Sequence, residues 1–220
     1  MNPTETNLRG MYERRFPETG QTKRNKLWRE LCRSFFSRYV SKKDTVLDIA
    51  AGYCEFINHI QCHRKIAMDI NPDVHLHSHP DVEVMNTSVA DLCLIPSGSI
   101  DVIFVSNFFE HIDKDTIQAV LCQCHRILRG GGKIIVLQPN IRLAGGAYWD
   151  FFDHQTPLTE KSLAEALELA QFKIKQMFPR FLPYTTKSAI PQHPLLVRLY
   201  LHFPLAWQLM GKQSLIIAET

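Results

Sequence analysis

Residues 46–56 read Val46-Leu47-Asp48-Ile49-Ala50-Ala51-Gly52-Tyr53-Cys54-Glu55-Phe56, an apolar run followed by a turn of small residues. The run predicts a buried strand over residues 45–50, and the sequence after the turn predicts a helix over residues 54–61. Small side chains in the turn allow a ligand to approach the backbone closely. In open parallel sheets, ligands bind beyond the carboxyl ends of the strands at the topological switch point. The turn is therefore a candidate ligand site.

Short apolar runs alternate with helical patterns from residue 45 to residue 139, which is typical of βαβ units and a parallel sheet. Further parallel strands are expected at residues 65–70, 82–86, 100–106 and 133–138. Further helices are expected around residues 72–76 and at residues 114–128. A run of three glycines, Gly130, Gly131 and Gly132, is expected to stop the second of these helices and to start the next strand.

Other elements flank this alternation. An apolar stripe with helical spacing precedes the first strand, and it predicts a helix that packs on the sheet and covers one side of the ligand cleft. The residues of this stripe are Leu27, Leu31, Phe35, Phe36 and Tyr39. Downstream, Thr159 is the expected N-cap of a helix that runs to residue 170. A strand at residues 172–178 and a terminal strand at residues 214–219 are expected after it.

The composition is that of one globular domain. With 220 residues, 45% of them hydrophobic and 21% charged, the chain is long enough to bury a core without disulfides or metal. We expect a single domain over residues 1–220, with an N-terminal helical cap at residues 1–44. The net charge of +3 is too small to indicate nucleic-acid binding.

The sequence predicts neither secretion, nor a membrane span, nor a metal site. The six cysteines lack the CxxC pairs of a zinc site and the spacing of a secreted framework, so we expect them to be reduced. The first residues are polar, and no run of about 18 apolar residues is present. His75, His77 and His79 resemble a metal motif by spacing, but a histidine run in a polar loop is usually solvated. We expect a cytoplasmic protein without a bound metal.

Polar residues follow the next three predicted strands. Asp69 lies about twenty residues past the turn, the spacing at which a carboxylate accepts hydrogen bonds from ribose hydroxyls. Asp91 follows the third strand, where it either faces the ligand or caps a helix. The fourth strand leads into Ser106-Asn107-Phe108-Phe109-Glu110-His111-Ile112. Because parallel strands end at one edge of a sheet, these residues are expected near the turn.

In this order the motifs resemble those of the class I S-adenosylmethionine-dependent methyltransferases, particularly the small-molecule, type 11-like branch. That branch has a strand followed by DxGxGxG, then two acids, then xxxxEH before a long helix. The resemblance covers residues 45–178. It implies a Rossmann-like α/β fold, a seven-stranded doubly wound sheet with an antiparallel last strand and helices on both faces. It also implies an S-adenosylmethionine site formed by Asp48, Ala50, Gly52, Asp69, Ile70, Ala90, Asp91 and Asn107.

The resemblance assigns these residues to different parts of the cofactor. Asp48 and Gly52 would shape the methionine end of the pocket, and Asp48 either contacts the ligand or orients the amides of the turn. Asp69 would hold the ribose. Asp91, together with Val89 or Ala90, would face the adenine.

The sequence departs from the family pattern at Ala50 and Cys54, which replace the first and third glycines of the turn. Each adds a Cβ where backbone torsion or ligand approach depends on its absence. We therefore expect the alanine and the cysteine to affect the affinity of the turn for its cofactor.

Candidate catalytic residues follow the fourth and fifth strands. Ionisable groups among aromatic side chains suit a pocket wall that desolvates a substrate and takes a proton from it. The candidates are His111, Tyr148, Asp153 and His154. A base is not obligatory, because positioning supplies roughly 7–11 kcal/mol of barrier reduction against roughly 10²–10⁴-fold from a general base. In the alternative interpretation, His111 belongs to the fold, and Tyr148 and Trp149 pack under the insertion described next.

An insertion at residues 181–211, between the last two predicted strands, is too apolar for a solvated loop. Pro204 is expected to break it into two short helical pieces. The segment is interpreted as a lid over the substrate, as a homodimer interface, or as a surface that meets a membrane or a lipid-linked substrate.

The leading hypothesis is an S-adenosylmethionine-dependent methyltransferase that acts on a hydroxyl or amine of a small molecule. Sugar or glycan, polyketide-like and lipid-linked intermediates are the substrates considered. A second hypothesis interprets the turn and Asp69 as the NAD site of an oxidoreductase, which predicts a GxGxxG motif that the turn lacks. A third hypothesis is a non-catalytic partner protein, in which the altered turn has lost tight cofactor binding and the insertion docks a second subunit.

Overall fold

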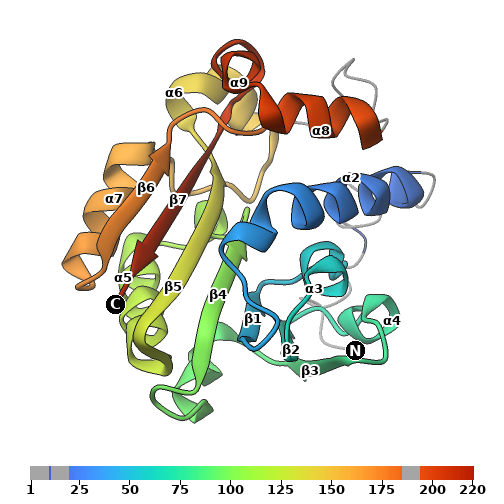
Figure 1. Ribbon diagram of the computed structural model, residues 1–220. Coiled ribbons are helices and arrows are strands. Elements are labelled where there is room, and N and C mark those ends of the chain that lie inside the picture. Colours follow the sequence, from blue (N-terminus) through green and yellow to red (C-terminus); the bar gives the residue numbers. More distant parts are fainter. Residues whose placement is uncertain (1–9, 11–19, 185–193) are drawn as a thin grey trace.

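The computed structural model describes residue 10, residues 20–184 and residues 194–220. In these residues a seven-stranded sheet crosses the molecule, with helices on both of its faces (Figure 1). The strands are β1 (Thr45–Ile49), β2 (Arg64–Asp69), β3 (Val82–Asn86), β4 (Ile100–Ser106), β5 (Leu128–Pro139), β6 (Lys173–Phe178) and β7 (Gln213–Glu219). Their order in space is β3-β2-β1-β4-β5-β7-β6.

The strand directions confirm the predicted doubly wound sheet. β1 to β5 run parallel, and β7 runs antiparallel to both of its neighbours, β5 and β6. From β1, the strands β2 and β3 are added on one side and β4 and β5 on the other, so the strand order reverses between β1 and β4. These two strands are adjacent, with Ile49 opposite Val105. The turn after β1 and the loop after β4 therefore leave the same edge of the sheet, at the switch point where such folds bind ligands.

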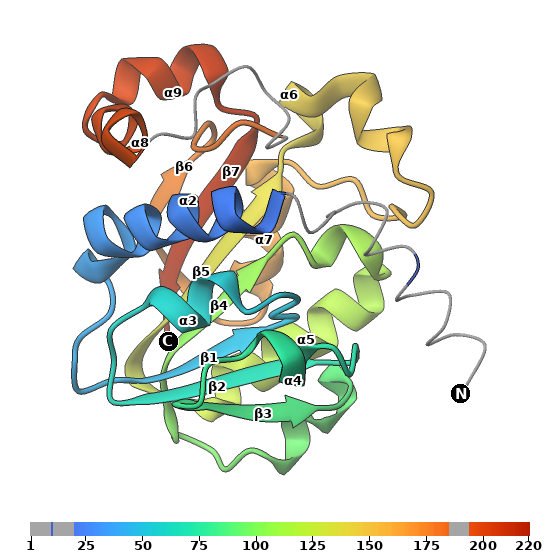
Figure 2. The ribbon, with the colours of Figure 1, turned by 90° about the vertical axis from the view of Figure 1, so that its right-hand side faces the viewer.

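Helices cover the two faces of the sheet in separate layers (Figure 2). One layer contains α2 (Gln21–Ser34), α3 (Glu55–His59) and α4 (Val74–His77). The opposite layer contains α5 (Lys114–Ile127) and α7 (Glu160–Leu169). The stripe before β1 packs on the sheet as predicted, with Leu31, Phe35 and Phe36 buried. α2 ends before Phe36, which begins a short 3-10 helix over Phe36–Arg38.

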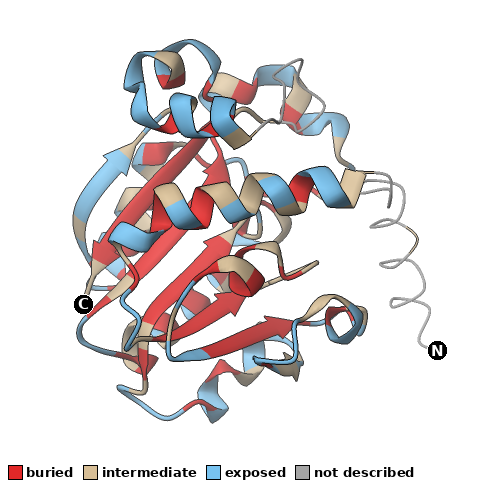
Figure 3. Ribbon diagram, turned by 45° about the vertical axis from the view of Figure 1, so that its right-hand side comes forward, coloured by how far each residue is buried: buried red, intermediate tan, exposed pale blue. Residues whose placement is uncertain are grey.

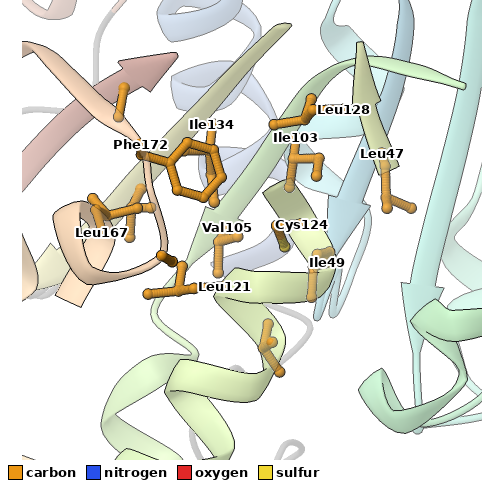
Figure 4. Packing of buried hydrophobic residues seen from close by; sticks show 14 of the residues in the cluster. Leu47, Ile49, Ile103, Val105, Leu121, Cys124, Leu128, Ile134, Leu167 and Phe172 are labelled. Carbon is orange, nitrogen blue, oxygen red and sulfur yellow. The ribbon is translucent and has the colours of Figure 1, made fainter. Parts of the chain in front are cut away.

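The core lies on both sides of the sheet, so the central strands are buried along their length (Figure 3). All five residues of β1 are buried. Strands covered on both faces form continuous apolar runs, which is why the sequence predicted them without alternation. On one face, Leu47 and Ile103 pack with Leu121 and Cys124 of α5 (Figure 4). Cys122, two residues before Cys124, is exposed, as expected from the helical spacing.

The predicted start of α7 is confirmed by its capping residues. The Thr159 hydroxyl accepts a hydrogen bond from the Ser162 backbone N–H at 3.1 Å. In return, the Ser162 hydroxyl accepts one from the Thr159 N–H at 2.9 Å. This reciprocal capping box satisfies two backbone donors that the helix itself leaves without partners.

The helix predicted over residues 114–128 is confirmed to within one residue, but the predicted start of the next strand at residue 133 is wrong. The helix ends at Ile127, before the glycines, and its C-cap Leu128 has extended backbone with ψ of 144°. Leu128 is 4% exposed and pairs with Ile100 of β4, so β5 begins there and the three glycines lie inside it, where the pairing with β4 is irregular. Strand pairing at a buried leucine therefore starts the strand earlier than the glycine signal indicates.

The insertion between β6 and β7 contains two helices, α8 (Pro194–His202) and α9 (Pro204–Met210). Pro204 separates them as predicted and occupies the first turn of α9. Val197, Leu201 and Trp207 bury their side chains in the same apolar layer as α2. None of the described helices combines the length and apolarity needed to cross a bilayer. Residues 185–193 of the insertion and most of the first 19 residues of the predicted cap lie outside the described part.

Candidate active site

The turn after β1 has left-handed backbone at three alternate residues. Ala50, Gly52 and Cys54 have φ angles of 55°, 53° and 58°. A Cβ makes this region roughly 1–2 kcal/mol less favourable, a cost from which glycine is free. These residues occupy the three glycine positions of the methyltransferase-like motif. The turn therefore keeps the backbone of a glycine-rich loop although two of its glycines are replaced.

Hydrogen bonds to β2 hold this turn against the sheet. The Ala51 N–H donates to the Met68 carbonyl at 3.1 Å, and the Gly52 N–H donates to the Asp69 carboxylate at 2.7 Å. The same carboxylate accepts from the Asn71 N–H at 2.7 Å. Asp69 therefore has a structural role that the sequence did not indicate. Because a carboxylate has about four acceptor positions, two amides leave capacity for the hydroxyls of a ligand.

Two buried carboxyl groups lie beneath the turn. Asp48 is 3% exposed and Asp69 is 4% exposed. Burial raises the pKa of Asp48 well above its usual range, and Asp69 raises it further, while a hydrogen bond from the Ile57 backbone lowers it. Burial also raises the pKa of Asp69, against the two amides that lower it. A positive charge placed beside them would favour their ionised forms, so this site is suited to a cationic ligand.

The remaining predicted cofactor residues lie at neighbouring strand ends. Ile70 directly follows β2 and exposes 55% of its surface beside the buried Asp69. Ala90 and Asp91 lie in a 3-10 helix after β3, whose N-cap is Ser88. Asp91 is therefore not the cap of this helix, which removes the structural alternative considered for it.

Side-chain and backbone contacts position Asp91 and Asn107 at this edge. The Thr87 hydroxyl donates to the Asp91 carboxylate. Asn107 directly follows β4 with φ of 50°, and its N–H donates to the Leu137 carbonyl of β5 at 2.9 Å. The predicted cofactor residues thus all lie at the carboxyl ends of β1 to β4. Their contacts with a cofactor stay predictions.

A second group of side chains forms where the loops after β4 and β5 meet. The Nδ1 atom of His111 lies 3.0 Å from a carboxylate oxygen of Asp153. The ring centroids of His111 and His154 are 4.9 Å apart, and those of Tyr148 and His154 are 4.5 Å apart. The structure therefore brings all four predicted catalytic residues into one cluster.

Hydrogen bonds join the two loops that carry this cluster. The Glu110 carbonyl accepts from the backbone N–H of Gln155 at 2.9 Å and of Thr156 at 3.2 Å. The Thr156 hydroxyl donates to the Ile112 carbonyl at 2.6 Å. The Gln155 side-chain amide donates to the His111 carbonyl. Backbone pairing thus sets the spacing of the clustered side chains.

Tyr148 and Trp149 lie in different environments. Tyr148 is fully buried, and its hydroxyl donates to the Thr156 carbonyl at 2.6 Å. Burial raises the pKa of Tyr148, and the nearby Glu110 adds to this effect. Trp149 is 55% exposed, so it does not pack beneath the insertion. Tyr148 is built into the wall of the cluster rather than available as a proton acceptor.

Glu110 belongs to this cluster, but it was not among the predicted site residues. It is 1% exposed. A carboxylate oxygen of Glu110 and ring nitrogens of His111 and His154 lie within 4.8 Å of one another. Burying a carboxylate is costly unless it has compensating partners, so an acid between Phe109 and His111, just after the apolar fourth strand, is a signal that could have identified it.

A groove of about 610 Å³ lies elsewhere, between β6, α9 and the 3-10 helix after α2. Its lining includes Phe35, Tyr39, Phe178 and Trp207. None of the predicted site residues lines this groove, which lies along β6, the edge strand at the far end of the sheet from β3. We therefore place the candidate active site at the strand ends.

Known proteins resemble this chain in sequence and in structure. Residues 47–136, which include the turn after β1, β4 and most of β5, match the family model described as a methyltransferase domain. Residues 47–136 of this chain are therefore similar to a methyltransferase domain. An S-adenosylmethionine-dependent methyltransferase from Archaeoglobus fulgidus, of known structure, is 19% identical and superimposes with a TM-score of 0.67, covering 96% of this chain and 98% of that chain.

Two further solved structures resemble this chain. A methyltransferase from Haloferax volcanii, solved in complex with a methyltransferase activator, has 13% identity and a TM-score of 0.68 over 98% of this chain and 96% of that chain. The [4+2]-cyclase SpnF has 15% identity and a TM-score of 0.58 over 84% of this chain and 77% of that chain. No curated protein matches the sequence significantly. Because a cyclase shares this fold, the fold does not specify the reaction.

Proposed function

We propose that the protein transfers a methyl group from S-adenosylmethionine to a hydroxyl or amine of a small molecule. The observation that carries this proposal is the pair of buried carboxylates, Asp48 and Asp69, beneath a left-handed turn at the switch point. When bound, the cofactor supplies an electrophilic methyl group on a sulfonium, and its transfer leaves a neutral thioether while the acceptor loses a proton.

The residues present fit this cofactor. Asp48 would offset the positive charge at the methionine end, and the turn around Gly52 would admit the ligand close to the backbone. Asp69 retains acceptor capacity for ribose hydroxyls beyond its two amide bonds. Ile70, with 55% of its surface exposed, would offer an apolar contact to the adenine.

Electrostatics favours this cofactor over a nicotinamide dinucleotide. A dinucleotide places its pyrophosphate against backbone amides at a helix N-terminus. Here Asp48 and Asp69 lie beneath the turn, whereas Glu55 in the first turn of α3 is paired with Arg24 at 2.8 Å. The two aspartates would repel a pyrophosphate and would attract a sulfonium or ammonium group.

The cluster at the ends of β4 and β5 is proposed to bind the acceptor. The Asp153 carboxylate lies beside Nδ1 of His111. The other ring nitrogen, Nε2, therefore points away from that carboxylate and would be the one available to the acceptor. His111 and His154 would supply imidazole nitrogens next to the acceptor atom. Tyr148 would position His154, because its own hydroxyl is bonded to the Thr156 carbonyl.

Calorimetric titration with S-adenosylhomocysteine, the by-product, tests the cofactor assignment. We expect one site per chain, and Ile70→Ser should weaken binding about tenfold because an apolar contact worth about 1.5 kcal/mol is lost. Leu169→Ser is the matched control, since Leu169 is 71% exposed at the end of α7. No heat at millimolar ligand, together with fluorescence changes on adding NADH, would favour the oxidoreductase instead.

A non-catalytic role predicts a different pair of results. The protein would bind S-adenosylhomocysteine weakly or not at all and would form a stable complex through residues 181–211. Solution mass and the cofactor dissociation constant together separate this role from the enzyme. Methyl transfer by a monomer would exclude it.

A lipid-linked acceptor is the substrate class that the insertion supports. α8 and α9 lie above the carboxyl end of the sheet (Figure 1). Their exposed apolar residues are Leu195, Leu196, Leu199, Phe203, Leu205, Leu209 and Met210. Residues 179–213 contain Arg180, Lys187, Arg198 and Lys212 but no Asp or Glu. An apolar surface flanked by cations alone suits an anionic membrane that carries such an acceptor.

Co-sedimentation with vesicles tests this part of the proposal. We expect binding to phosphatidylcholine vesicles that contain phosphatidylglycerol, and loss of binding in the Leu205→Glu, Leu209→Glu double variant. Leu169→Glu on α7 is the control for an added charge at an exposed leucine. If the wild type instead shows a doubled mass in solution that the double variant abolishes, residues 181–211 form a homodimer interface.

A further inference from the structure

We propose that Glu110, His111 and His154 bind a divalent transition-metal ion where the loops after β4 and β5 meet. One carboxylate oxygen and two ring nitrogens of these residues lie within 4.8 Å of one another. Within the described part of the chain, no other set of three His, Cys, Asp or Glu side chains forms such a group. The His75, His77 and His79 run, which has metal-like spacing in the sequence, does not form one.

The donor set indicates the class of metal. Two imidazoles and one carboxylate are the ligands of catalytic zinc sites and of non-haem iron sites, which keep positions open for a substrate or water. Mg²⁺ and Ca²⁺ prefer oxygen ligands. Zinc ligands lie about 2.0–2.2 Å from the ion, so the three donor atoms would approach one another to about 3.3 Å on binding. His111, with 27% of its side chain exposed, has room for that rotation.

A neighbouring carboxylate already orients one of the proposed ligands. The Asp153 carboxylate lies 3.0 Å from Nδ1 of His111, which leaves Nε2 as the donor atom. Metal-binding histidines usually donate their other ring N–H to a carboxylate or carbonyl, which fixes the tautomer and raises the basicity of the ligand. Asp153 is thus a positioning residue for the site. This contact is independent of the spacing of the three donor atoms.

The surroundings of the other two ligands also restrict their orientation. The His154 ring stacks on Phe151, with centroids 5.0 Å apart and planes inclined by 28°. Tyr148 contacts the same ring from another side, with centroids 4.5 Å apart. Glu110 is 1% exposed, and its backbone carbonyl is bonded to Gln155 and Thr156.

A bound ion would also restrict which atom of the substrate accepts the methyl group. This extension rests on the proposed methyl transfer. An open position on the ion would take the hydroxyl oxygen of the acceptor and would lower the pKa of that hydroxyl, as a metal does for bound water. The hydroxyl proton would pass to solvent, and the oxygen would then attack the methyl carbon. His111 and His154 would hold the ion rather than the proton. The acceptor atom would therefore be oxygen rather than nitrogen.

Zinc titration of the full-length, chelator-treated protein tests the site without any methyl acceptor. Zn²⁺ is added in competition with a chromogenic chelator, and Co²⁺ provides a visible spectrum of the coordination. We expect one ion per chain, with affinity reduced at least 100-fold in His154→Gln and His111→Gln. Asp153→Asn should reduce it about 10–100-fold and should alter the Co²⁺ spectrum. The His75→Gln, His79→Gln double variant is the matched control and should bind as the wild type does.

Any of three results would overturn this inference. The wild type could fail to bind Zn²⁺ stoichiometrically, His111→Gln could bind Zn²⁺ as the wild type does, or the His75→Gln, His79→Gln control could lose binding. Circular dichroism without metal checks the fold of each variant, and the partly exposed His111 carries the test if the buried Glu110 or His154 variants fail to fold. Titration of the same metal-free protein with S-adenosylhomocysteine is scored separately, so that the metal site and the cofactor site fail or succeed independently.

Discussion

The Nδ1 atom of His111 and a carboxylate oxygen of Asp153 lie 3.0 Å apart. The two residues come from the loops after β4 and β5, and each side chain is 27% exposed. A carboxylate at this distance favours the tautomer that carries its hydrogen on Nδ1, which would leave the lone pair on Nε2. The pair thus specifies which nitrogen of His111 is available to a proton or to a cation.

Removing Asp153 should change the tautomer of His111. In the metal-free protein near pH 8, we expect the Nδ1–H form in the wild type and a shift toward the Nε2–H form in Asp153→Ala. Long-range ¹⁵N–¹H correlation spectra of the histidine rings distinguish the two forms. Asp150→Ala, an exposed substitution in the same loop, serves as the control. An unchanged His111 tautomer in Asp153→Ala would contradict the orienting role.

Glycine at position 50 should stabilise the turn. Ala50→Gly removes a left-handed alanine that costs roughly 1–2 kcal/mol, against an entropy cost for glycine of roughly 0.5–1 kcal/mol. We expect the free energy of unfolding, measured with urea, to rise by about 0.5 kcal/mol, and the cofactor to bind more tightly. Ala51→Gly is the matched control, because Ala51 is not among the left-handed residues. It should lose stability, and equal effects at the two positions would refute the explanation.

The third glycine position should respond differently. Cys54 also has a left-handed backbone, but its side chain is fully buried and packs in the layer below α2. Cys54→Gly therefore removes packing together with strain. We expect a net loss of stability of about 1 kcal/mol in urea unfolding, since a buried side chain contributes more than the strain costs. A gain in stability would show that backbone strain dominates at this position.

Asp69 should contribute to stability as well as to cofactor binding. Asp69→Ala leaves the buried amides of Gly52 and Asn71 without their acceptor, which should cost about 1–3 kcal/mol of unfolding free energy. Asp69→Asn keeps one acceptor oxygen and should retain more of the stability while still weakening S-adenosylhomocysteine binding. Urea unfolding and calorimetry separate the two effects. If Asp69→Ala is as stable as the wild type, the structural role is wrong.

Acid should destabilise the fold through His59. Burial lowers the pKa of His59 to about 4 from 6.5, and Arg29, His79 and Lys65 lower it further. Between these values the unfolded chain binds the proton more readily, so stability falls as the pH drops from 6.5 toward 4. Allowing for partial exposure, we expect about 1–2 kcal/mol of this loss to disappear in His59→Gln. Urea unfolding across this pH range measures it, and identical slopes would contradict the assignment.

Much of the fold is predictable from local sequence. The bounds of β3 and β4 agree with the prediction, and the separation of α8 from α9 by Pro204 does so too. Strands buried on both faces must be continuously apolar, and proline cannot continue a helix, so both signals are local. The start of β5 is not local. It depends on Leu128 pairing with Ile100, a contact between separate segments.

The candidate site divides in the same way. The strand-end residues from Asp48 to Asn107 were predictable, because parallel strands bring all their carboxyl ends to one edge of the sheet. Asp153 and His154 were predicted on the same face as His111, but their individual contacts were not predictable, since no periodicity encodes how the loop after β5 folds back. Hydrogen bonds from the Gln155 and Thr156 backbone to the Glu110 carbonyl hold the loop after β5 against the loop after β4. Local patterning thus places the cofactor edge, whereas long-range backbone pairing joins Glu110, His111 and His154 into one cluster.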